Sequence, residues 1–193
     1  MRTLGKFRID IAGLSDSRLT GFGTLNSETY HILYSGLETR KEAGVGMALN
    51  RRTKKCLVNW EPINERILRA GFATSQAKLT VVAVYALSND SCDQNKDDFY
   101  RVLSNVVVKA HRHDIVTVCG DFNDEVGNDD SYAPAILGKH GLGEINDNGA
   151  EIAAKLLQPN YFTINITDSL HNMSKVSRKL TESKIKQPIG LTR

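Results

Sequence analysis

The hydrophobic positions of this chain fall into short runs separated by polar turns, with one longer stretch at helical spacing. The short runs are predicted to be strands at residues 9–14, 30–34, 45–49, 79–87, 115–119 and, with weaker alternation, 161–166. The run at 79–87 is β-branched and apolar throughout, as expected for a central strand buried on both faces. Residues 63–72 are mixed in character and fit neither period well.

One amphipathic helix is predicted over residues 93–110, followed after the next strand by a polar loop at 124–149 and a short helix at 151–157. The loop is rich in polar residues, and Pro159 would end the short helix. The apolar stripe of the long helix is a pattern that core packing explains, and it comprises Phe99, Val102, Leu103, Val106, Val107 and Ala110. Strands interspersed with helices indicate an α/β or α+β domain.

The composition is that of an ordinary globular protein. A chain of 193 residues with 40% hydrophobic and 24% charged residues is one domain with a sizeable core. The net charge of +3 permits contact with a polyanion without requiring one. The N-terminus lacks the apolar core of a signal peptide, no stretch approaches the ~20 apolar residues of a membrane span, and the cysteines have no zinc or disulfide spacing. We expect an intracellular protein of the nucleus or cytoplasm that is neither secreted nor bound to a membrane.

The character of the chain changes at Asp168. From there to the end, basic side chains outnumber acidic ones and apolar periodicity is weak. We expect one domain over residues 1–167 and a poorly ordered tail over 168–193. Trp60 and Pro62 are expected in a surface loop.

Polar clusters follow three of the predicted strands. Asp16 follows the first, Tyr85 and Asn89 lie at the end of the strongest, and Asp121 and Asn123 follow the strand that ends at residue 119. Each cluster alone also fits an ordinary turn, and Tyr85 fits a core aromatic. Together they are more specific, because active sites of layered α/β proteins lie where strand ends converge. A carboxylate beside an amide can orient a water for attack on a phosphoryl centre, and magnesium prefers such oxygen ligands.

Seven segments, in this order, resemble the endonuclease/exonuclease/phosphatase superfamily. The similarity is greatest to its retrotransposon-derived branch, related to the endonuclease domains of LINE-type elements and known as craniofacial development protein 2-like. The segments are LSDSRLTG (14–21), GVG (44–46), WEPINERI (60–67), YALSND (85–90), KDDFY (96–100), GDFNDEVG (120–127) and HGLGEINDNG (140–149).

This resemblance implies a four-layer α/β sandwich of the deoxyribonuclease I-like type. It also implies hydrolysis of phosphodiester bonds in DNA with Mg²⁺, or alternatively Mn²⁺, as cofactor. Carried over to this chain, Asp121 orients or deprotonates the attacking water and Asn123 holds the water or the phosphate. Tyr85 and Asn89 contact the phosphate, and Asp16 occupies the place of the metal-binding glutamate.

The chain also departs from the family pattern. The family glutamate is shortened to Asp16, and the proline expected after Tyr85-Ala86 is Leu87. The family's first-strand asparagine and its closing Ser-Asp-His segment are missing, so we expect a domain truncated at both ends, with a degenerate site and weak or no activity. The alternative is a catalytically inactive binding or scaffold protein derived from a retroelement endonuclease.

Overall fold

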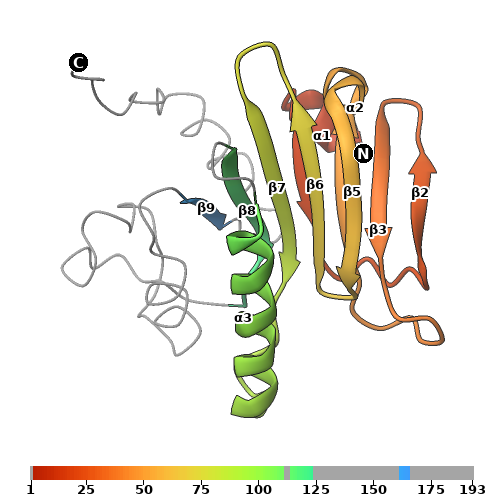
Figure 1. The fold of residues 1–193 in the computed structure, drawn as a ribbon. Coiled ribbons are helices and arrows are strands. Elements are labelled where there is room, and N and C mark those ends of the chain that lie inside the picture. Colours follow the sequence, from red (N-terminus) through yellow and green to blue (C-terminus); the bar gives the residue numbers. More distant parts are fainter. Residues whose placement is uncertain (1, 111–113, 124–160, 166–193) are drawn as a thin grey trace, which may run out of the picture.

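The computed structural model describes residues 2–110, 114–123 and 161–165 (Figure 1). Several sequence-based predictions fall outside these residues and stay predictions: the loop at 124–149, the helix at 151–157 and the tail at 168–193. The helices are α1 (Arg2–Lys6), α2 (Arg51–Cys56) and α3 (Asp93–Val108). The strands are β1 (Ile11–Leu14), β2 (Phe22–Asn26), β3 (Tyr30–Ser35), β4 (Val45–Asn50), β5 (Leu57–Asn64), β6 (Ile67–Ala73), β7 (Lys78–Tyr85), β8 (Ile115–Asp121) and β9 (Tyr161–Asn165).

The strands form two sheets. The first sheet has the order β1-β4-β3-β2 and is antiparallel throughout. The second has the order β5-β6-β7-β8-β9, antiparallel up to β7 and parallel from β7 to β9. Because β7, β8 and β9 run in the same direction, their carboxyl ends lie at one edge of the second sheet.

Two apolar clusters hold the layers together. The first lies between the sheets, where Leu33, Met47 and Leu49 of the first sheet meet Leu68 and Val81 of the second. The other lies between the second sheet and α3, which covers the outer face of that sheet (Figure 1). Its helical members are Phe99, Tyr100, Leu103, Val106 and Val107. The predicted α/β sandwich is thereby confirmed, with β7 as its predicted central strand.

Most predicted elements are confirmed within one to three residues of their ends. The long helix ends at Val108 rather than at residue 110, and β7 ends at Tyr85, so Leu87 lies beyond the strand. The mixed stretch at 63–72 splits into the end of β5 and most of β6. None of the helices within the described residues is long and apolar enough to cross a bilayer.

The prediction of a surface loop around Trp60 and Pro62 is wrong. Both residues lie in β5, and Trp60 packs against the cluster between the sheets. A proline is compatible with this strand because β5 is at the edge of its sheet, where a missing backbone N–H need not break a ladder.

Candidate functional site

The ends of β1, β7 and β8 meet at one edge of the sandwich through the side chain of Ser15. This hydroxyl donates to the backbone carbonyl of Val84 at 3.3 Å and accepts from the backbone N–H of Asp121 at 3.2 Å. One side chain after β1 therefore contacts the last residues of both β7 and β8. Asp16, the next residue along the chain, is thereby held at the edge where Asp121 leaves the sheet.

Gly120 permits the close approach of β8 to β7 just before Asp121. Its φ is 144°, and a Cβ at this position would overlap the carbonyl group of Val84. Only glycine fits both the backbone angle and the space. Close packing of the two strands thus explains why glycine stands at the start of the Gly-Asp-Phe-Asn segment.

Asp121 and Asn123 form a local turn against the chain that follows β7. The Asp121 carboxylate accepts from the backbone N–H of Asn123 at 2.9 Å. The Asn123 side-chain amide donates to the Ala86 carbonyl at 2.8 Å, and the Ala86 N–H donates to the Asp121 carbonyl at 2.8 Å. Asn123 has a φ of 47°, a left-handed conformation that asparagine tolerates better than most residues. These bonds fix the two side chains at the end of β8.

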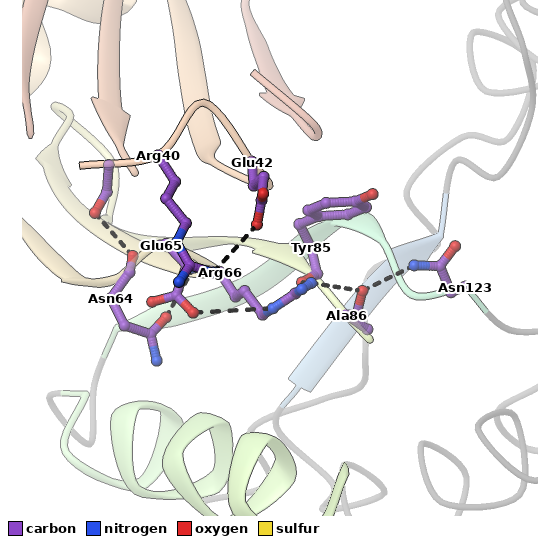
Figure 2. A network of polar contacts seen from close by, with 9 residues as sticks. Arg40, Glu42, Asn64, Glu65, Arg66, Tyr85, Ala86 and Asn123 are labelled. Atoms are coloured by element: carbon purple, nitrogen blue, oxygen red, sulfur yellow. Dashed lines mark hydrogen bonds and ion pairs between the residues drawn. The ribbon is translucent and has the colours of Figure 1, made fainter. Parts of the chain in front are cut away.

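Tyr85 is half-buried at the end of β7 and lies beside Arg66. Figure 2 shows Arg66 reaching toward Tyr85 and Ala86, and its guanidinium donates to both backbone carbonyls at 3.2 Å. The Arg66 Cζ atom also lies 5.2 Å from the centroid of the Tyr85 ring, within range of a cation–π contact. Arg66 therefore holds both the backbone and the ring at this position.

The surroundings of Tyr85 favour its protonated phenol. Burial raises the pKa of Tyr85, and the negative charges of Asp16 and Asp121 raise it further, while Arg66 and Arg18 oppose them. Since both carboxylates act on the phenol, the two aspartates and Tyr85 share one electrostatic environment. A phenol that keeps its proton can donate a hydrogen bond to a phosphate oxygen.

Asp16 is partly exposed, with 42% of its side chain accessible, and forms an ion pair with Arg18. Both donating nitrogens of Arg18 contact the same Asp16 oxygen, Oδ2, at 3.1 and 3.0 Å. Asp16 and Arg18 have φ values of 50° and 53°, in the left-handed region that costs free energy for such residues. The loop is held in this shape because the N–H groups of Ser17 and Arg18 donate to the carbonyls of Gly44 and Ala43.

Four of the five candidate residues, Asp16, Tyr85, Asp121 and Asn123, therefore lie at one edge. Asn89 lies four residues beyond β7 with an exposed side chain, and its backbone carbonyl accepts from the Lys96 ammonium at 3.4 Å. Among the contacts of the described residues, none joins Asn89 to the other four candidates.

Sequence reasoning missed Ser15 and Arg66, whose side chains organise this edge through backbone groups. Both lie inside the segments quoted for the family resemblance, LSDSRLTG and WEPINERI. That position in the motifs was the available signal, because neither residue shows a pattern of its own.

The oxygen donors at the edge fit a hard divalent cation. Asp16 and Asp121 supply two carboxylates, and magnesium commonly uses one or two together with water. Within the described part of the chain, no three His, Cys, Asp or Glu residues gather as a potential metal site. The Asp16 carboxylate is also engaged by Arg18, so a cation there would compete with the guanidinium.

The chain is similar in sequence to two curated proteins. The chain is 30% identical over 147 residues to craniofacial development protein 2 of Bos taurus, which covers 76% of this chain and 24% of that protein. The match to craniofacial development protein 2 of Tragulus javanicus is 29% identical over 149 residues, covering 77% and 26%. The chain is a homologue of craniofacial development protein 2. It spans about a quarter of the length of these curated relatives.

Solved structures with a related arrangement include TDP2 of D. rerio in complex with a single-strand DNA product. That comparison has a TM-score of 0.46 at 18% identity and covers 63% of this chain and 51% of TDP2. A humanized D. rerio TDP2 gives a TM-score of 0.48 at 19% identity, with 74% and 57% covered. No protein-family model matches the chain.

Proposed function

We propose that this chain is a divalent-cation-dependent phosphodiesterase of the DNA endonuclease type, with slow hydrolysis at a degenerate site. The observation that carries the proposal is the convergence of Asp16, Tyr85 and Asp121 at one edge, through Ser15 and through the charges that act on the Tyr85 phenol. Homology to craniofacial development protein 2 and the seven segments that resemble the endonuclease/exonuclease/phosphatase superfamily support it.

Each residue has a role that follows from its chemistry. Asp121, fixed by its turn with Asn123, orients a water or accepts its proton. The protonated Tyr85 phenol donates to a phosphate oxygen. Asn123 supports the same water or phosphate, and Asn89 reaches the phosphate from the loop after β7.

Asp16 and Asp121 are the residues that would hold Mg²⁺, or Mn²⁺ in its place. When bound, the cation would supply charge neutralisation on the phosphate and a bound water of lowered pKa. The protein contributes the placement of the two carboxylates and of the phenol. Because these groups are already in position, they need not reorganise as charge develops on the phosphate in the transition state.

Slow turnover follows from two features of Asp16. Its side chain is one methylene shorter than glutamate, and its carboxylate is paired with Arg18 at 3.0 Å. Since a metal site depends on close placement of its ligands, both features weaken the hold on a cation. We expect a rate about 10²–10⁴ below that of a site with all its groups in place.

Nicking of supercoiled plasmid in magnesium tests this proposal. Wild type should convert plasmid slowly to the open circle, EDTA should stop the reaction, and Asp121→Ala should abolish it. Asp98→Ala removes an exposed carboxylate of α3 from the far side of the second sheet and is the matched control. Nicking that survives both EDTA and Asp121→Ala would refute the proposal.

The Asp16–Arg18 pair also favours a second candidate, a binding or scaffold protein without catalysis. In that case the positive charge of Arg18 takes the place of the cation, and this edge of the sandwich binds DNA without cleaving it. Tight DNA binding without nicking in either magnesium or manganese would select this second function.

A further inference from the structure

A groove of about 970 Å³ opens at the end of the first sheet opposite to the candidate site. It is bounded by the chain between α1 and β1, the start of β3 and the junction of β4 with α2. Strand β1 runs from this groove toward Asp16, and its four residues alone separate the two ends by about 13 Å. The groove is therefore a distinct surface.

Positive charge dominates the groove. Arg8, Arg51 and Arg52 line it and are exposed, against the single carboxylate of Asp10. That carboxylate accepts from the neutral side-chain amide of Asn50, and the ion pairs of the described residues include none between Asp10 and an arginine.

The three arginines lack carboxylate partners within the described part of the chain. The guanidinium of Arg51 donates to the backbone carbonyl of Glu28 at 3.2 Å, a contact that leaves its charge uncompensated. The ion pairs found among these residues involve other cations. Helix α2, Arg-Arg-Thr-Lys-Lys-Cys, which begins with two of these arginines, also carries Lys54 and Lys55 and contains no acidic residue.

The backbone that carries these side chains is fixed. The Tyr30 hydroxyl donates to the Ile9 carbonyl at 2.8 Å, and the Thr53 hydroxyl donates to the Asp10 carbonyl at 2.9 Å. The Asn50 side chain accepts from the N–H groups of Arg52 and Thr53 and so caps α2. The arginines project from a preorganised scaffold, which lowers the entropy cost of binding a ligand.

We infer that this groove binds the phosphodiester backbone of a nucleic acid. Arginine presents donors in a planar fork that matches phosphate oxygens, and several uncompensated arginines on one open groove suit a chain of phosphates rather than one anion. The apolar lining residues, Ile9 and Tyr30, are half-buried and buried, so the groove offers charge but no side chain that inserts among lipid tails. This surface does not depend on the proposed catalytic function.

Binding of a fluorescent oligothymidylate in EDTA tests the inference without any cleavage. The triple variant Arg8→Gln, Arg51→Gln, Arg52→Gln should weaken binding by about tenfold or more at low salt. It should also make the negative slope of log K against log salt shallower by about 2. The variant Arg101→Gln, Lys109→Gln, on and just beyond α3, removes charge elsewhere and should change binding far less.

Hydrogen exchange of the wild-type protein provides a second readout that needs no substitution. Addition of the oligonucleotide should slow amide exchange at residues 50–56. Equal loss of binding in the triple variant and in the α3 variant, or no slowing at 50–56, would overturn the inference. Arginine-dependent binding to phosphatidylserine vesicles without binding to the oligonucleotide would also overturn it.

Discussion

The hydroxyl of Ser15 accepts a hydrogen bond from the backbone N–H of Asp121 at 3.2 Å, across 106 positions of sequence. The same hydroxyl donates to Val84, so one small side chain joins the ends of three strands. The candidate site therefore depends on a residue that has no catalytic chemistry of its own.

Replacement of Ser15 by alanine should lower the free energy of unfolding by about 1–3 kcal/mol, because the part-buried N–H of Asp121 loses its acceptor. Urea unfolding measures this change. Ser75→Ala, in an exposed turn, is the control and should lie within about 0.5 kcal/mol of wild type. Equal stability of the two variants would show that Ser15 does not hold the strand ends together.

Replacement of Gly120 by alanine should destabilise the fold by about 2 kcal/mol or more, since alanine meets both an unfavourable φ of 144° and the carbonyl of Val84. Gly5→Ala in α1 is the matched control, because a Cβ there meets no atom within 4 Å. Thermal unfolding of the two variants distinguishes them. A Gly120→Ala protein as stable as the Gly5→Ala protein would contradict the close approach of β7 and β8.

Removal of Arg18 should strengthen cation binding at the edge. An exposed ion pair is weak because water screens it, so Arg18→Gln should tighten binding of Mn²⁺ by no more than about fivefold when followed by electron paramagnetic resonance. Arg40→Gln removes the same charge from an exposed pair with Glu42 and serves as control. Weaker Mn²⁺ binding in Arg18→Gln would mean that the arginine supports the site instead of competing with the cation.

Burial raises the pKa of the Cys119 thiol from 9.0 to about 11. The folded state therefore favours the protonated thiol. The stability that the protonated thiol contributes to the folded state is complete below pH 9 and is lost as the pH rises toward 11. This rise corresponds to about 3 kcal/mol at most, so wild type should lose stability over this range more steeply than Cys119→Ala. Parallel stability curves for the two proteins between these pH values would refute the assignment.

The sequence was sufficient for elements with a clear period. β7 was predicted because its residues are apolar throughout. α3 was predicted because its apolar residues recur every three to four positions. Strand β2 was missed because it is an exposed edge strand, with Phe22 63% and Leu25 44% accessible, and so shows no alternation between buried and exposed positions. Helix α2 was missed because its six residues, mostly basic, have no apolar stripe.

Some residues of the candidate site could likewise be predicted from the sequence, and others could not. Asp16 and Asp121 could be selected because each follows an apolar run, and Tyr85 because it lies near the end of the strongest one. Ser15 and Arg66 could not, because they act on backbone carbonyls and N–H groups that only the folded topology brings near them. The Asp16–Arg18 pair was likewise invisible, since it arises from two left-handed residues in one turn.

The most direct test of the central claim is a double-mutant cycle on single-turnover nicking of DNA in magnesium. If Asp16 and Asp121 act as one phosphodiester-cleaving unit, Asp16→Asn and Asp121→Asn should each abolish most of the EDTA-sensitive rate. The double variant should then be no slower than the slower single variant, because groups that act together are strongly non-additive. Rate losses that multiply, or a wild-type protein without EDTA-sensitive nicking, would contradict a shared catalytic site at this edge.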